Sequence, residues 1–499
     1  MLNILNLIKT NKLILATFAF LAVLAFGTGR VHAATLNITG GCTLPIAINS
    51  VNAGANQSGC TASGSYGTND TINLPAGTTT LTSDLPTITE SVSIEGAGLA
   101  QTMISGDNGQ FSVFKAEITD GNVAISSMKL TAFSDQAIQI QSTDGNVSLV
   151  SLDIDGNSSV GNGILLTFLG TGTNDFTSDS VYVHDFISTN DTLGFSLSRE
   201  ETGTTNAVIT NTTVANIAVT TDAGAYGFGM YAGVRGGSSG GGVLNVDVTN
   251  VTVDNLSGQT FVAPFYALAF GSNGNTTVNA NVTYATIIGT RGSVRDLGGE
   301  NLESAAFYAI SGGFGGGETG TSIINVKNSL FADNLMDGES KNCGLIDVTS
   351  AFSGVGSGVS QINSQGNNIS DDTTCTSFNQ LGDQQNINNI ISTLGPLKNN
   401  GGNVPTRALL PGSPAINTGG SVLGVTTDAR GIVRPGTCPS VGAFQFEGAV
   451  CAASTTNAGT NAGAPNTGIG AVSPAMTIIA TSLGLGIIAY ALSKRTAVK

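Results

Sequence analysis

The chain has 499 residues, only 10% of which are charged, and acidic residues outnumber basic ones 33 to 18. This balance excludes a nucleic-acid-binding protein that depends on a basic surface. With 68 glycines, 12 prolines, no tryptophan and 40% hydrophobic residues, the chain is neither collagen-like nor of disordered composition. Many Gly, Asn, Ser and Thr residues beside Val and Ile, with few Lys and Glu, predict an all-β fold of short strands and many turns.

The first 33 residues have the organisation of a secretory signal peptide. A basic start leads into an uncharged apolar run of 14 residues, Leu13–Phe26, and Val31 to Ala33 then supplies a small-x-small cleavage site before Ala34. The alternative is an uncleaved membrane anchor, but a spanning helix needs roughly 20 apolar residues. We therefore expect secretion, with cleavage between Ala33 and Ala34.

One short strand pattern recurs along the middle of the chain. Seven segments align on an apolar residue at intervals of 24 to 44 residues, and the positions two and five residues earlier are mostly apolar too. A polar residue three positions before the aligned one marks a bend. Short strands that recur, meet at polar bends and keep an apolar column predict a parallel β-helix, whereas a β-sandwich, the alternative, does not keep one column over so many repeats. The aligned apolar residues are Leu130, Ile154, Val183, Val214, Val253, Ile287 and Phe331, and the polar ones are Ser127, Ser151, Ser180, Asn211, Asn250, Tyr284 and Asn328.

The polar column and the unequal intervals give two further expectations. Stacked Asn and Ser side chains can hydrogen-bond from one repeat to the next and satisfy backbone groups at the bend. Intervals of different length predict projecting loops. We expect the Gly-rich insertions Gly224–Gly242 and Gly312–Gly320 to form them.

The end of the chain has the parts of a sorting signal. Residues 469–492 form a 24-residue stretch without a charge, long enough to span a bilayer, and a basic tail follows. Just before it, Ala464-Pro465-Asn466-Thr467-Gly468 resembles the Leu-Pro-x-Thr-Gly signal of sortase substrates, with Ala464 in place of Leu. The resemblance implies that a sortase cuts after Thr467 and joins it to the cell-wall peptidoglycan. The alternative is a transmembrane helix that stays in the membrane.

A segment near each end resembles bacterial surface proteins. Cys42 to Ile48, with Asp70–Gly77 and Ile94–Gly98, resembles the CSLREA-type region, although Pro45 and Ile46 replace the usual Arg-Glu. The resemblance implies the start of a right-handed β-helix.

The second resemblance lies towards the C-terminus. Gly395–Gly402, Pro405–Asn417, Asp428–Gly431 and Val441–Phe444 resemble the choice-of-anchor Q domain. That family implies a right-handed, pectate-lyase-like parallel β-helix on a Gram-positive-type cell surface, placed before a sorting signal. It assigns no catalytic residues.

These features divide the chain into consecutive parts. We expect a signal peptide (1–33), a CSLREA-like region that begins the β-helix (34–115), the β-helix body (116–390), a choice-of-anchor Q-like cap (391–449), a linker (450–463) and the sorting signal (464–499) with its helix at 469–492. Removal of both targeting segments would leave 12 basic and 33 acidic residues, a net charge of −21, and His184 as the one histidine.

All six cysteines lie in the part expected to be exported, where an even number indicates disulfides. Sequential neighbours are 18, 32 and 13 residues apart, whereas most of the other pairings would span hundreds of residues. We therefore favour three bonds between neighbours, and we expect no zinc because no cysteine pair has metal-ligand spacing. The expected pairs are Cys42 with Cys60, Cys343 with Cys375, and Cys438 with Cys451.

Stacking would bring acidic residues and the remaining histidine together. One position after the aligned column, Asp155 and His184 would be neighbours on adjacent repeats, about 5 Å apart. Asp153 and Asp185 lie beside them, and Lys129 is the nearest basic residue. Such acids could act on a glycosidic bond or hold calcium. The alternative interpretation is a solvated polar face without a catalytic role, and one histidine excludes a multi-histidine metal site.

The sequence thus predicts a secreted stalk or adhesin, anchored to the cell wall or plasma membrane, that presents loops to glycans, to host cells or to neighbouring cells. One alternative is a carbohydrate-active enzyme, a polysaccharide lyase or hydrolase, with Asp153, Asp155, His184 and Asp185 at its site; its acidic face would fit neutral glycans. Another alternative is a structural surface-layer component that self-assembles. We expect no cofactor other than calcium and no nucleic-acid partner.

Overall fold

The computed structural model describes residues 33–157, 161–221, 226–235, 240–271, 274–296, 301–314, 318–347 and 355–448. Within these ranges almost all regular structure is β-strand, beside one α-helix, α2 (Leu44–Ala53), and one 3-10 helix, η2 (Ile390–Thr393). The predicted all-β class is confirmed. The chain divides into two units, Met1–Cys451 and Ala452–Lys499, and only the first contains described residues.

The predicted targeting segments fall largely outside the described residues. These are the signal peptide up to residue 32, the linker and the whole sorting signal. Among the described residues, no helix has the length and apolar character needed to cross a membrane.

Two large sheets account for most of the described strands. The first has 21 strands: β1 (Thr35–Asn37), β2 (Asp70–Asn73), β3 (Gly77–Thr80), β4 (Val92–Glu95), β5 (Thr102–Ser105), β7 (Asn122–Thr131), β9 (Asn146–Asp155), β11 (Thr173–Ser188), β13 (Gly203–Thr210), β14 (Thr213–Val219), β16 (Gly242–Thr249), β17 (Thr252–Gly258), β19 (Thr276–Thr283), β20 (Thr286–Ile288), β21 (Arg291–Gly292), β25 (Gly320–Lys327), β26 (Leu330–Ala332), β27 (Leu335–Met336), β28 (Glu339–Ser340), β31 (Gly358–Ser364) and β32 (Ile369–Ser370). The second has nine: β6 (Phe114–Ile118), β8 (Gln136–Ser142), β10 (Asn162–Phe168), β12 (Thr192–Arg199), β15 (Gly227–Arg235), β18 (Val262–Gly271), β24 (Phe307–Phe314), β29 (Cys343–Asp347) and β30 (Val355–Gly356). Two small pairs complete the strands, β22 (Val294–Asp296) with β23 (Asn301–Glu303) and β33 (Leu394–Lys398) with β34 (Thr406–Leu409).

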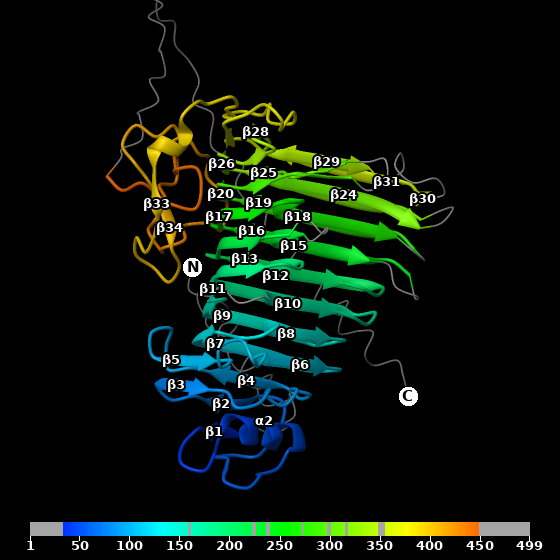
Figure 1. The fold of residues 1–499 in the computed structure, drawn as a ribbon, viewed down its shortest axis with the longest axis vertical. Coiled ribbons are helices and arrows are strands. Elements are labelled where there is room, and N and C mark those ends of the chain that lie inside the picture. The colour runs from blue at the N-terminus through cyan, green and yellow to red at the C-terminus, as the bar shows by residue number, and fades with distance from the viewer. Residues whose placement is uncertain are drawn as a thin grey trace, which may run out of the picture. The chain divides into compact units, whose positions relative to one another are not determined.

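The predicted repeats lie in register. Each repeat adds strands to both large sheets, and Figure 1 shows them piled in chain order from the blue N-terminal end to the yellow end. The pairing between repeats is parallel, which excludes the antiparallel sandwich and is compatible with a parallel β-helix. We call the two large sheets and the apolar interior between them the stack. The aligned column pairs in the order Leu130, Ile154, Val183, Val214, Val253, Ile287 and Phe331.

The aligned apolar column lies in the interior of the stack. All seven of its side chains are at most 1% exposed. Outward and inward positions alternate along strands such as β16 and β19, because successive side chains of a strand point to opposite faces. Burial of this column in every repeat stabilises the stack by roughly 25 cal/mol for each Å² of apolar surface removed from water.

Residues with left-handed backbone make two bends in the 21-stranded sheet. The seven predicted polar residues form the first bend, with φ between 48° and 61°. A second bend follows two positions after the aligned column and was not predicted. Asn and Asp adopt this conformation more readily than most residues, and their recurrence at this position was the available signal. The second bend contains Asp185, Asn216, Asn255 and Asp333, with φ between 55° and 62°.

Two of the predicted disulfides are confirmed, and they lie towards opposite ends of the stack. Cys42–Cys60 joins the start of α2 to the segment that follows this helix, at the N-terminal end in Figure 1. Cys343–Cys375 joins β29 to the chain that follows β32. Cys438 is also disulfide-bonded. Its expected partner, Cys451, lies outside the described residues.

The described residues of Gly224–Gly242 are mostly strand, so the prediction of a projecting loop is wrong there. For Gly312–Gly320 it stays a prediction, because residues 315–317 lie outside the described residues. The centre of Gly224–Gly242 is strand β15, which pairs with β12 and β18, and Gly312–Phe314 belongs to β24. Glycine is needed here for space: a Cβ on Gly233 would lie 2.5 Å from ring carbons of Tyr231. Tyr231 belongs to a buried aromatic cluster on the face of the nine-stranded sheet that points away from the interior.

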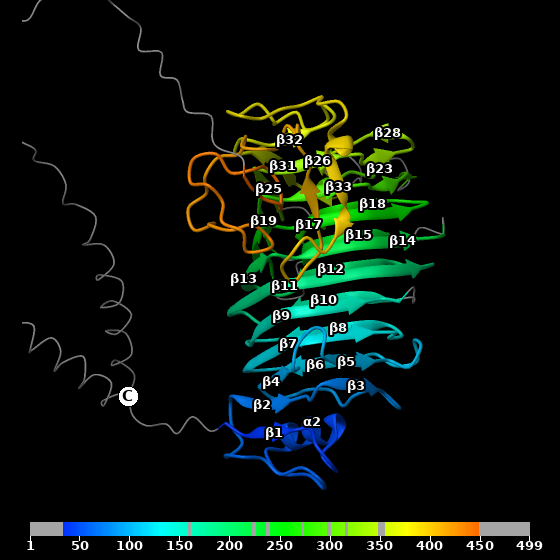
Figure 2. The ribbon, with the colours of Figure 1, turned by 90° about the vertical axis from the view of Figure 1, so that its left-hand side faces the viewer.

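Residues 391–448, here called the C-terminal segment, fold back along the side of the stack. Figures 1 and 2 both show β33 and β34 beside the middle repeats. Thr213 donates a 2.7 Å hydrogen bond to the carbonyl of Pro405, and Asn250 of the first bend donates a 3.0 Å bond to the carbonyl of Thr427. An apolar cluster that includes Leu330 and Phe444 lies between the two parts. The C-terminal segment therefore covers the first bend of these repeats.

Candidate functional site

The structure brings together the predicted residues Lys129, Asp153, Asp155, His184 and Asp185, which we call the His184 group. Strands β7, β9 and β11 lie side by side, so that Lys129 is in register with Asp153, and Asp155 is in register with His184. Asp185 follows at the second bend. The pairing of Asp155 with His184 on adjacent repeats is the one that the aligned columns predicted.

The imidazole of His184 is held between two carboxylates. Its Nδ1 lies 2.7 Å from Oδ2 of Asp185, and its Nε2 lies 2.8 Å from Oδ1 of Asp153. The ring of Tyr182 stacks on the imidazole with 3.8 Å between ring centroids, and His184 is only 7% exposed. Both ring nitrogens are thus occupied, and the ring is largely removed from solvent.

These contacts favour the protonated form of His184. Burial alone would lower its pKa, but the hydrogen bonds to Asp153 and Asp185 and the charges of Asp153 and Asp155 outweigh burial and raise the pKa. A protonated imidazole donates through both nitrogens and keeps no lone pair. In this protonated form His184 can neither accept a proton from a substrate nor bind a metal ion.

Lys129 pairs with Asp155 and also with Asp153, which it shares with His184. Its Nζ lies 2.8 Å from Oδ2 of Asp155 and 3.6 Å from Oδ2 of Asp153. Burial alone would lower the pKa of Lys129, but the bonds and charges of both aspartates raise it. For Asp155, burial would raise the pKa, and the bond to Lys129 and the backbone N–H of Asn157 lower it. A base for proton abstraction needs the opposite change in a lysine, a lowered pKa.

A metal ion would find few free ligands here. Ligand atoms of Asp155, His184 and Asp185 lie within 4.8 Å of one another. Calcium takes six to eight oxygen ligands, and this group offers two carboxylates beside an imidazole whose pKa is raised. The geometry fits a network of ion pairs better than either a metal centre or an acid–base pair.

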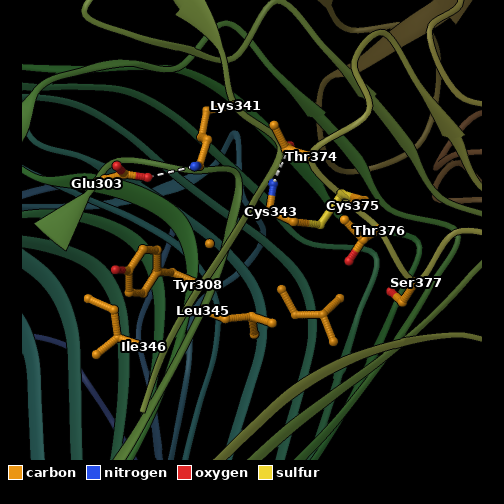
Figure 3. Close-up of a pocket in the computed structure, with 12 residues that line it drawn as sticks. Glu303, Tyr308, Lys341, Cys343, Leu345, Ile346, Thr374, Cys375, Thr376 and Ser377 are labelled. Atoms are coloured by element: carbon orange, nitrogen blue, oxygen red, sulfur yellow. Dashed lines mark hydrogen bonds and ion pairs between the residues drawn. A yellow bond between two sulfur atoms is a disulfide. The ribbon is translucent and has the colours of Figure 1, made fainter. Parts of the chain in front are cut away.

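A second concave region lies beside the disulfide Cys343–Cys375 (Figure 3). The disulfide was predicted from the sequence, but the pocket was not. This pocket has a volume of about 380 Å³. Lys341 Nζ lies 2.6 Å from Oε2 of Glu303 on one side, so both charges are paired. Burial raises the pKa of the Tyr308 phenol, which keeps it neutral. No lining group is activated for catalysis by these contacts.

Comparisons of the chain with protein-family models, with curated proteins and with solved structures found no match. The resemblances at the two ends of the chain therefore stay hypotheses.

Proposed function

We propose that this protein is a right-handed parallel β-helix that is displayed on the cell surface and acts as a stalk or adhesin in contact with glycans. The observation that carries the proposal is the register of the stack, which continues through all seven aligned repeats. Such a stack gains length with each repeat without needing a larger core, and its outward side chains can change without disturbing the interior.

Two further observations support this function. Disulfides near both ends of the stack fit an oxidising, extracellular location. In the His184 group the ion pairs and raised pKa values favour a structural network over a catalytic site. A surface protein that binds but does not cut glycans is consistent with both.

The proposed attachment uses the sorting signal and can be tested at Thr467. Thr467→Ala is expected to move the protein from the cell-wall fraction to the membrane fraction, because sortase forms its acyl bond at this residue. Asn466→Ala is the matched control, since Asn466 occupies the single variable position of the Leu-Pro-x-Thr-Gly signal that this segment resembles. Wall attachment that persists in Thr467→Ala would overturn sortase anchoring.

The proposed glycan contact can be tested with the purified full-length protein. Incubation with neutral and anionic glycans, followed by mass analysis of bound and free species, is expected to show intact glycans retained by the protein. New fragments that disappear in Asp155→Ala would instead make the protein a depolymerase. A sedimentation measurement in the same buffer is expected to show a monomer, and large assemblies would favour a surface-layer component.

A further inference from the structure

A groove follows the second bend of the stack, next to the His184 group. Two concave regions of about 370 and 360 Å³ adjoin there and share Asn216 and Asn255 as lining residues. We call the two together the bend groove. It crosses several repeats and therefore runs along the direction in which the repeats pile up.

The floor of the bend groove is a ladder of polar side chains. Asn216 Nδ2 donates a 2.7 Å hydrogen bond to Asp185 Oδ1, and Asn255 Nδ2 donates a 2.9 Å bond to Asn216 Oδ1. This ladder holds the carboxylate of Asp185 and the two amides in a row, one side chain from each of three successive repeats. Neighbouring repeats lie about 4.8 Å apart, close to the length of one sugar residue in an extended glycan.

The two walls of the bend groove differ. One wall is an outward-facing column in which Ile187 and Ala218 are in register, and Ile187 is 45% exposed. The other wall includes Leu397 and Arg407 of the C-terminal segment. The folding back of this segment therefore supplies part of the lining of one region, while Ile187 and Ala218 line the other, so that both regions offer apolar surface beside the shared polar floor.

Every charged side chain that lines the bend groove has a partner of opposite charge among the described residues. The pairs are Asp155 with Lys129, Asp185 with His184, Asp254 with Arg407, and Asp333 with Arg291. An anionic ligand would meet carboxylates without a free cation. A ligand rich in hydroxyl groups can instead use the amides, which both donate and accept hydrogen bonds.

We propose that the bend groove binds a neutral oligosaccharide laid along the direction of the stack. Hydroxyl groups bind the Asn ladder and the adjoining carboxylates, and the C–H faces of the sugars pack on Ile187. This inference rests on the proposed contact with glycans and names its site and its ligand class.

The test measures binding of neutral gluco-, manno- and galacto-oligosaccharides to the full-length protein, with polygalacturonate as an anionic comparator. Ile187→Glu places a charge on the wall and is expected to weaken binding at least about tenfold, because the carboxylate would be desolvated by the sugar. Val208→Glu is its control, since Val208 on β13 is 43% exposed and lies outside the groove.

A second pair of variants removes one amide without changing the backbone. Asn255→Gly keeps the left-handed conformation (φ 57°), and Asn211→Gly does the same at the first bend (φ 48°), outside the groove. Weaker binding in Asn255→Gly and Ile187→Glu, with unchanged binding in both controls, is the expected result. All four variants are first compared with the natural protein by thermal unfolding.

The other outcomes separate the inference from the proposed function. Glycan binding that is unchanged in Ile187→Glu and Asn255→Gly overturns the bend groove as the site and leaves the glycan contact intact. Binding of polygalacturonate alone overturns the neutral ligand class. If no glycan binds to the natural protein, both the inference and the proposed glycan contact are wrong.

Discussion

Arg407 and Asp254, 153 residues apart in the chain, form an ion pair that joins the C-terminal segment to the stack. Arg407 Nη2 lies 2.9 Å from Asp254 Oδ1, and Nε donates to Oδ2. The side chain of Asp254 is 2% exposed and that of Arg407 is 20% exposed. Because the pair is largely removed from water, loss of one partner leaves a buried charge without compensation.

We therefore expect Arg407→Met to lower the free energy of unfolding by about 3 kcal/mol. The double variant Arg407→Met with Asp254→Asn should recover part of this loss, since neither charge then remains. Urea unfolding of both single variants and the double variant measures the coupling. Additive losses would contradict a direct interaction between the two side chains.

Asn328 provides a second test of how the C-terminal segment is held. It is fully buried with φ 53°, its Nδ2 donates to the carbonyl of Gly420, and its Oδ1 accepts from the N–H of Gly420. Asn328→Ala should lower the free energy of unfolding by about 3 kcal/mol, from backbone strain and unpaired polar groups. Asn328→Gly should lower the free energy of unfolding by about 1 kcal/mol less than Asn328→Ala does, because glycine removes the backbone strain. Equal losses in a denaturant titration would show that strain at this bend is unimportant.

His184 predicts a dependence of stability on pH. Its pKa is raised in the folded chain, so its stabilisation is complete below the usual value of 6.5 and is lost as the pH rises through the raised value. The free energy of unfolding should fall as the pH rises above about 6.5, and His184→Asn should remove most of this slope. Urea unfolding at a series of pH values from below 6.5 upwards provides the measurement. If the free energy of unfolding changed with pH in the same way in the natural protein and in His184→Asn, the raised pKa of His184 would be contradicted.

The disulfide Cys343–Cys375 is expected to stabilise the end of the stack. Replacement of both cysteines by serine frees a loop of 32 residues and should cost about 2 to 4 kcal/mol. Hydrogen exchange should rise first in β29 and in the chain after β32, because the bond joins these segments. Faster exchange confined to the N-terminal end, near Cys42–Cys60, would contradict this assignment.

Local pattern was sufficient to predict the repeat. Apolar residues spaced by strand geometry identified the interior column, and the pairing of Leu130 through Phe331 follows it in every repeat. The same columns placed Asp155 beside His184. These predictions succeed because stacking converts a position in the repeat into a position in space.

Other features depend on contacts between distant parts of the chain. The strands inside the Gly-rich insertion were missed because glycine usually marks turns, whereas Gly233 makes room for the ring of Tyr231. The second bend was missed although Asn and Asp recur there. The protonated state favoured for His184 depends on the carboxylates around it and not on its position in the repeat.

Sequence patterns were enough to predict the all-β class, the repeat register, two of the disulfides and the neighbours of His184, because each depends on periodic positions or on short separations along the chain. They could not predict that the C-terminal segment folds back on the first bend, or that Arg407 and Leu397 line the bend groove. These contacts join non-repeating residues across long separations, where no period relates one partner to the other, so they are seen only in the folded chain.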